Sequence, residues 1–174
     1  THSYALVEGE GDIDNASFII NGSNLIINSS PDYETQESYR IRLKTTDSSG
    51  ETFVEEFTIG IKDVNETPTD IALSSSSFDE NIDAASVVAT LSSTDEDTGD
   101  THSYALVEGE GDIDNASFII DGSNLIINSS PDYETQESYS IRLKTIDSSG
   151  ESYVEVFTIG IKDVNETPTD IALS

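Results

Sequence analysis

The hexapeptide Asp-Val-Asn-Glu-Thr-Pro occupies residues 63–68 and returns unchanged at residues 163–168. It lies between stretches rich in β-forming residues, and Pro68 can neither donate to a strand ladder nor follow helical backbone easily. The hexapeptide therefore predicts a linker between two domains. Four side chains in or beside it offer the oxygen ligands that suit a hard cation such as calcium: Asp63, Asn65, Glu66 and Asp70. We interpret it as a joint that calcium stiffens.

The hexapeptide belongs to a much longer internal repeat. Residues 1–74 align without a gap to residues 101–174, and the copies differ only at 21/121, 40/140, 46/146, 52/152, 53/153 and 56/156. A period of 100 residues is too long for a solenoid repeat and suits a tandem array of sandwich domains. The sequence predicts a first repeat at 1–70 that lacks its first two strands, a complete repeat at 71–170, and the start of the next repeat at 171–174.

The strand pattern of the complete repeat predicts the fold class. Segments of alternating or β-branched residues, separated by Gly, Asp and Asn turns, predict seven strands: 71–74, 86–91, 102–107, 117–120, 124–127, 139–145 and 153–161. Asp121-Gly122 is a strong hairpin signal, and no stretch has a helical period. We expect an all-β protein made of tandem seven-stranded Greek-key (immunoglobulin-like) β-sandwiches.

Composition limits the partners. The 174 residues carry a net charge of -28, with 35 acidic and 7 basic side chains, which argues against nucleic acid or an anionic membrane as partner. The acids gather at turns and linkers, which favours cation sites over a merely solubilising or salt-adapted surface. Cysteine is absent, so no disulfide or thiol chemistry is available. With no signal peptide or membrane-spanning run visible, we expect the chain to be a piece of a longer one.

The unit resembles a cadherin repeat, especially the cadherin-like repeats of large bacterial surface proteins. Five motifs carry the resemblance, in the family's order: Asp79-Glu80-Asn81, Asp95-Glu96-Asp97, Asp132-Tyr133-Glu134, Asp147 and the linker at 163–168. The match covers essentially the whole chain. It implies a calcium-binding extracellular protein at the cell surface that serves in cell adhesion, with calcium ions and the neighbouring repeats of the same chain as partners.

The resemblance also implies which residues hold calcium at the first linker. The ligands would be the side chains of Asp32, Glu34, Asn65, Glu66, Asp95, Asp97 and Asp147, the carbonyls of Val64 and Thr67, and a backbone oxygen near Asp100. Asp63 is not counted as a direct ligand. Glu66 stands where vertebrate members usually have Asp. The first copy has no counterpart of Glu80, which bridges two ions in the family, so this joint is expected to bind fewer ions than its relatives.

The second linker, at residues 163–168, is expected to have only part of the ligands of a calcium site. It has Glu80, Asp132, Glu134, Asn165 and Glu166, but the acids of a following repeat lie beyond Ser174. Any single Asp is more often a solvated rim residue than a ligand. Clustering changes this balance, because two carboxylates about 5 Å apart repel by roughly 3 kcal/mol at an effective dielectric constant of about 20. Oxygen-only ligands then favour calcium over zinc or copper.

Catalysis is not expected. The carboxylate pairs recur with the repeat at module ends, where a catalytic pocket would be unique, and His2 and His102 are expected in surface or capping roles. Two functions remain: a spacer that stiffens and extends a cell-surface adhesin, which we favour, and a binding module for homophilic contacts or for carbohydrate. The truncated first repeat exposes a core face and a sheet edge. We expect strands from a neighbouring molecule, by strand-swapped self-association, or chain outside these residues to cover them.

Overall fold

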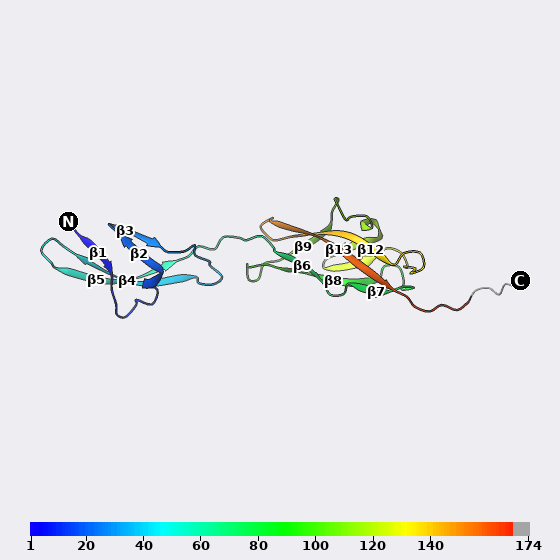
Figure 1. The fold of residues 1–174 in the computed structure, drawn as a ribbon, viewed down its shortest axis with the longest axis horizontal. Coiled ribbons are helices and arrows are strands. Elements are labelled where there is room, and N and C mark those ends of the chain that lie inside the picture. The colour runs from blue at the N-terminus through cyan, green and yellow to red at the C-terminus, as the bar shows by residue number, and fades with distance from the viewer. Residues whose placement is uncertain (169–174) are drawn as a thin grey trace, which may run out of the picture. The chain divides into compact units, whose positions relative to one another are not determined.

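The computed structural model describes residues 1–168, and strands make up nearly all of its regular structure (Figure 1). The chain divides into two compact units, unit 1 at Thr1–Val64 and unit 2 from Asn65 onward. The predicted start of a further repeat at 171–174 lies outside the described residues. None of the helices in the described part of the chain has the length and hydropathy needed to cross a membrane.

Unit 2 is a β-sandwich, which confirms the predicted fold class. Its strands are β6 (Asp70–Leu73), β7 (Ser77–Asp79), β8 (Val87–Thr94), β9 (Ser103–Leu106), β10 (Phe118–Asp121), β11 (Asn124–Ile127), β12 (Ser138–Ile146) and β13 (Ser152–Lys162). They form two four-stranded sheets, with strand orders β10-β11-β8-β6 and β7-β13-β12-β9. Neighbouring strands are antiparallel except for β7 and β13, which run parallel.

The first strand of the sandwich is divided between the two sheets. The sequence predicted a single segment at 71–74, but the chain continues through Ser75 and Ser76 into β7, which joins the opposite sheet. The seven predicted strands are therefore eight segments. The pattern missed β7 because Phe78 is the one large apolar residue in it, and alternation over three residues carries no signal.

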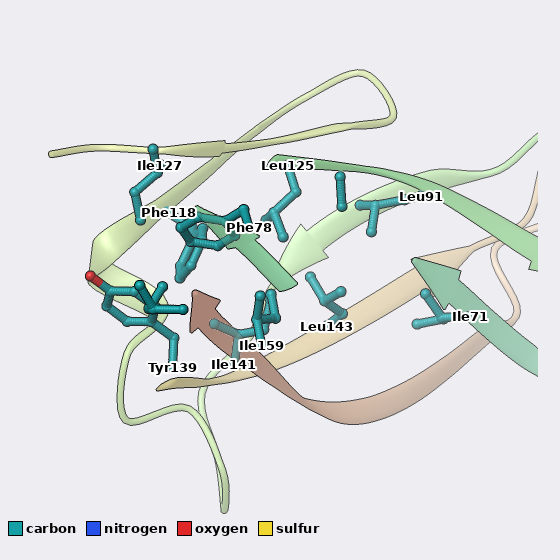
Figure 2. Packing of buried hydrophobic residues seen from close by; sticks show 12 residues of the cluster. Ile71, Phe78, Leu91, Phe118, Leu125, Ile127, Tyr139, Ile141, Leu143 and Ile159 are labelled. Carbon is teal, nitrogen blue, oxygen red and sulfur yellow. The ribbon is translucent and has the colours of Figure 1, made fainter. Parts of the chain in front are cut away.

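The core of unit 2 lies between these sheets (Figure 2). Along β12 the odd-numbered residues are buried and point inward, as the alternation predicted. The ring of Tyr139 packs edge-on against Phe118 at 5.2 Å and stacks on Phe78 at 6.3 Å between centroids. Leu125 and Ile141 are fully buried beside them. Such burial supplies the main stabilisation of a domain without disulfides.

The predicted hairpin is present between β10 and β11. Asp121 pairs with Asn124, so the connection is the two residues Gly122 and Ser123. Gly122 has a φ of +60°, which glycine adopts without the steric cost that other residues bear. A short 3-10 helix, η2 (Asn115–Ser117), precedes β10.

Unit 1 repeats the later part of this sandwich. It contains β1 (Ser3–Leu6), η1 (Asn15–Ser17), β2 (Phe18–Asn21), β3 (Asn24–Ile27), β4 (Ser38–Thr46) and β5 (Thr52–Gly60). The sheets are β1-β4-β5 and β2-β3, in the same register as their counterparts in unit 2. Within residues 1–64 no strand corresponds to β6, β7 or β8. The buried core of unit 1 is accordingly small, with only Phe18, Tyr39 and Ile41 at its centre.

Candidate metal sites

Unit 2 gathers carboxylates in two groups. The Asp147 group consists of Asp95, Asp100 and Asp147, and the Glu80 group consists of Glu80, Glu134, Asp163 and Glu166. Within each group, one oxygen of every carboxylate lies within 4.8 Å of the others. Like charges at such separations repel, so each group calls for a counter-charge.

Among the members of its group, Asp147 accepts the most hydrogen bonds. One oxygen accepts the backbone N–H groups of Ser149, Gly150 and Glu151, and the other accepts the Asn65 side-chain amide at 3.0 Å. The Asn65 hydrogen bond, aided by these N–H groups, lowers the pKa of Asp147 against the opposing effect of burial. Asp147 is therefore held as an anion beside the start of unit 2.

Asp95 has a partner that the sequence analysis missed. His102 Nε2 lies 2.9 Å from Asp95 Oδ2, and these side chains expose only 12% and 4% of their surface. The predicted surface or capping role does not describe this largely buried pair. His2, the twin of His102, is exposed in unit 1, where no counterpart of Asp95 exists. The sequence positions of His102 and Asp95 did not predict this contact, because the contact depends on how the end of β8 lies beside the start of β9.

The other predicted ligands in this part of unit 2 lie close by. The Glu66 N–H donates to Asp97 Oδ2 at 2.9 Å, and the Asp97 N–H donates to Asp95 Oδ1. A hydrogen bond from Ser148, followed by one from the Thr101 N–H, lowers the pKa of Asp100. Thr67, the next predicted ligand after Glu66, is exposed. The structure thus brings Asn65 and Glu66 together with the acids that follow β8 and β12.

The ligands predicted in unit 1 are Asp32, Glu34 and Val64. Asp32 closes the turn before β4, where it accepts hydrogen bonds from the Thr35 hydroxyl and N–H. The Thr35 hydroxyl, ahead of the backbone, lowers the pKa of Asp32. Glu34 and Val64 are exposed. Their share in a calcium joint stays a prediction.

The Glu80 group is built around a buried acid. Glu80 exposes 3% of its surface, and its two oxygens accept the N–H groups of Tyr133 and Val164, each at 2.7 Å. Glu80 therefore ties the loop before β12 to the segment after β13. A carboxylate with two such bonds still has lone pairs for a cation.

The pKa of Glu134 reflects the repulsion among the closely spaced carboxylates of the Glu80 group. A backbone hydrogen bond lowers it, but burial and the charges of Glu166, Glu80 and Asp163 outweigh that bond, so the pKa is raised. Asp163 is the member that sequence reasoning left out, because its twin Asp63 was not counted as a ligand. A bound cation would relieve this repulsion.

Asp132 and Asn165 complete the predicted set at this end of unit 2. Asp132 accepts hydrogen bonds from the Thr135 hydroxyl and N–H, and the Asn165 amide donates to the Glu166 carbonyl at 3.1 Å. An opening of about 700 Å³ lies here, lined by Asn81, Ser130, Pro131, Asp132, Glu134, Glu166, Thr167 and Pro168. Asp132 is on its wall but outside the closely spaced Glu80 group.

The chemistry of both groups fits calcium. The acidic members offer only carboxylate oxygens, the donors that Ca²⁺ prefers. Over residues 1–168, no lysine or arginine forms an ion pair with either group; Lys162 instead approaches exposed Asp79 at 3.9 Å. A divalent cation is therefore the natural counter-charge.

Comparisons with known proteins agree with this architecture. No family model matches the chain. A putative neural-cadherin 2 of Drosophila melanogaster is 34% identical over 113 residues, which are 63% of this chain and 6% of the relative. The Drosophila neural-cadherin is 31% identical over 149 residues, 79% of this chain and 5% of the relative. Protocadherin Fat 4 of Mus musculus is 29% identical over 181 residues, 99% of this chain and 4% of the relative.

Solved structures show the same fold. Extracellular cadherin domains 3–6 of protocadherin gamma B2 superpose with a TM-score of 0.70 at 20% identity, over 95% of this chain and 40% of that one. Human protocadherin-24 EC1-2 superposes with a TM-score of 0.68 at 18% identity, over 94% of this chain and 82% of that one. The fold is that of cadherin extracellular domains, and the sequence is cadherin-like. The chain spans between 4% and 6% of the length of these curated relatives. The finer resemblance, to bacterial surface proteins, stays a prediction.

Proposed function

We propose that the chain is a calcium-binding extracellular repeat that stiffens and extends a cell-surface adhesin and thereby serves cell adhesion. The observation that carries the proposal is the pair of carboxylate groups in unit 2, which lie among linker and loop residues and form no ion pair with lysine or arginine within residues 1–168. The similarity in fold to the extracellular cadherin domains of protocadherin gamma B2, and in sequence to the Drosophila neural-cadherin, supports the location and the role.

The proposal assigns the ligands by group. The Asp147 group, with Asn65, Glu66 and Asp97, would hold calcium where the first linker enters unit 2, and Asp32, Glu34, Val64 and Thr67 would contribute from the preceding repeat and the linker itself. The Glu80 group, with Asp132 and Asn165, would hold calcium at the second linker. Bound calcium would neutralise the carboxylates and fix the linker backbone against the loops.

A spacer role is better supported than carbohydrate binding. Within residues 65–168 of unit 2, the large hydrophobic side chains that are exposed are all aliphatic, and the exposed aromatic ones, Tyr4, Phe53 and Phe57, lie in unit 1, whereas their twins in unit 2 pack against its core. Near-identical repeats also suit a part whose length matters more than its individual side chains. Homophilic contact stays the alternative, and a self-association assay in calcium would detect it.

Calcium binding is tested by calorimetry on the chain with calcium and with chelator. We expect affinity typical of extracellular modules, on the order of 0.1 to 1 mM, and a thermal midpoint that rises with calcium concentration by mass action. Magnesium at the same concentration is the matched control. An unchanged midpoint at millimolar calcium would contradict calcium binding.

Stiffening needs a separate measurement, since calcium could bind without ordering the linker. Spin labels placed on exposed Ser48 of unit 1 and Ser123 of unit 2 would report the distribution of distances between the units. We expect chelation to broaden this distribution. A distance distribution that does not respond to calcium would contradict the role as a stiffened spacer, but it would not contradict calcium binding.

A further inference from the structure

The turn between β2 and β3 in unit 1 contains the one Asn-Gly dipeptide of the sequence, Asn21-Gly22. Asn21 is the last residue of β2 and pairs with Asn24, so Gly22 and Ser23 form a two-residue turn. Asn21, Gly22 and Ser23 are all exposed. Gly22 has a φ of +65°, and a Cβ added to it would meet nothing within 4 Å. The peptide bond that follows Asn21 is therefore accessible to water and unhindered.

The side-chain amide of Asn21 is free, unlike that of most asparagines in the chain. Seven side-chain amides donate to a carbonyl or carboxylate oxygen, those of Asn15, Asn28, Asn65, Asn81, Asn115, Asn128 and Asn165. Within residues 1–168, the amides of Asn21, Asn24 and Asn124 have no such partner. Leucine follows both Asn24 and Asn124, and its side chain crowds the backbone nitrogen, which glycine leaves open. Asn21 is thus the asparagine that combines a free amide with a following glycine.

The backbone nitrogen of Gly22 is free as well. It lies outside the β2–β3 ladder, and its N–H has no hydrogen-bond partner within the described residues 1–168. A nitrogen that donates to a carbonyl has to break that bond before it can act as a nucleophile, whereas the Gly22 nitrogen has no such bond to break. Both reacting groups, the Asn21 carboxamide and the Gly22 nitrogen, are therefore unrestrained by hydrogen bonds.

We propose that Asn21 is a site of spontaneous deamidation. The Gly22 nitrogen loses its proton to hydroxide and attacks Asn21 Cγ, and the bond from Cγ to the side-chain nitrogen breaks. Ammonia leaves with a proton taken from water, so that hydroxide is regenerated. Water then opens the succinimide at one of its two carbonyls, which gives either an aspartyl residue or an isoaspartyl residue whose main chain runs through the former side chain. The overall reaction consumes one water, releases one ammonia and adds one negative charge.

The corresponding turn of unit 2 shows that the fold accepts the aspartyl product. Asp121 occupies the twin position, and it pairs with Asn124 as Asn21 pairs with Asn24. Gly122 has a similar φ, +60°. Asp121 is exposed, so this turn is accessible in a complete sandwich as well. The isoaspartyl product, by contrast, lengthens the main chain by a methylene beside a turn that sets the strand register, and it should destabilise the hairpin.

Deamidation is tested by incubation of the isotopically labelled 174-residue chain in heavy-oxygen water, at neutral and at mildly alkaline pH. NMR spectroscopy follows the side-chain amides, and mass spectrometry of peptides follows the products. We expect loss of the Asn21 amide signals ahead of any loss at Asn28 or Asn128, which precede serine but donate to the Ala16 and Ala116 carbonyls. The products should contain one heavy oxygen from water. The rate should rise with pH, because the attacking nitrogen has to be deprotonated.

Exchange of the residues at the two turns supplies matched controls. Asn21→Asp should remove the site, and Asp121→Asn should create a second site in unit 2, because the turns have the same pairing. The proposal is overturned if the native chain keeps its Asn21 amide while the same chain in urea loses it, since the hairpin would then hold the nitrogen away from Cγ. Loss at Asn24 or Asn28 as fast as at Asn21 would also overturn it, because the free amide and the following glycine would then not decide the site.

Discussion

The side chain of Asp147 has two roles: it accepts backbone N–H groups of the turn that follows it, and it belongs to a cluster of carboxylates, the Asp147 group. Its twin Asp47 makes a similar turn, in which the N–H groups of Ser49 and Glu51 donate to one carboxylate oxygen. Asp47 is only half-buried, however, whereas Asp147 is buried beside Asn65. A comparison of Asp47 with Asp147 can therefore separate the structural role of this aspartate from its proposed role in a calcium site.

We predict that Asp147→Asn lowers calcium affinity tenfold or more, because even the loss of an outer partner of a metal ligand commonly costs that much. Asp47→Asn, the matched variant, should disturb its turn and leave calcium affinity within about twofold. Calcium titration followed by calorimetry measures both. Equal losses in the two variants would mean that Asp147 acts only through its turn.

Tyr139 gives a prediction at alkaline pH. Burial, followed by the charges of Asp114 and Asp132, raises its pKa above the ordinary value of 10.0. The folded state thus keeps the phenol protonated where the unfolded chain begins to ionise. This contribution to stability is complete below pH 10.0 and is lost as the pH rises through the folded-state pKa.

Tyr139→Phe keeps the ring contacts with Phe78 and Phe118 and removes the ionisable group. The difference in unfolding free energy between wild type and Tyr139→Phe should be constant from pH 7 to 9 and should change in favour of the variant above about pH 10. Urea denaturation across this range measures it. A difference that does not depend on pH would show that Tyr139 titrates alike in both states.

At the scale of elements, β3 and β11 have the same residues in different surroundings. Leu125 on β11, which pairs with β8, is fully buried, whereas Leu25 on β3 is half-buried. We predict that Leu125→Ala destabilises unit 2 by about 2–5 kcal/mol through lost burial and a new cavity, and that Leu25→Ala costs unit 1 clearly less.

Denaturation followed by signals assigned to each unit measures the two losses. Ile13→Ala and Ile113→Ala serve as controls, since both side chains are exposed and should cost little. Similar large losses for Leu25 and Leu125 would mean that the face of unit 1 is already covered in solution.

Strands in which apolar and polar residues alternate over many positions were predictable from the sequence. The odd-numbered residues of β12 and the turn after Asp121 follow from parity and turn chemistry, which are local properties. The division of the first strand and the parallel pairing of β7 with β13 depend on residues far apart in sequence. His102 and Asp95 are only seven residues apart, but no periodic pattern or turn signal relates them. The acidic motifs predicted which loops carry carboxylates but not that Asp163 joins Glu80.

At the scale of the whole molecule, the two units should differ in stability although their sequences nearly coincide. Unit 2 has a core of twelve buried residues, against three in unit 1, and hydrophobic burial is the main driving force of folding. We predict two unfolding transitions in urea, with unit 1 unfolding first.

Calcium should move mainly the second transition, by about 2.7 kcal/mol at a concentration one hundred times the dissociation constant. Intrinsic tyrosine fluorescence and assigned NMR signals follow the transitions. A single transition that calcium shifts as a whole would contradict the independence of the units.

The near-identity of the two units has a consequence for folding during synthesis. Synthesis proceeds from the N-terminus, and domains generally fold as they emerge. Residues 1–64 and the segment from β6 to β8 therefore emerge from the ribosome before residues 101–168 do. Until then this segment can meet the twin of its binding surface on unit 1 before it meets the correct one. If the face of unit 1 is covered when the segment emerges, the segment stays free for unit 2, the domain that has still to be made.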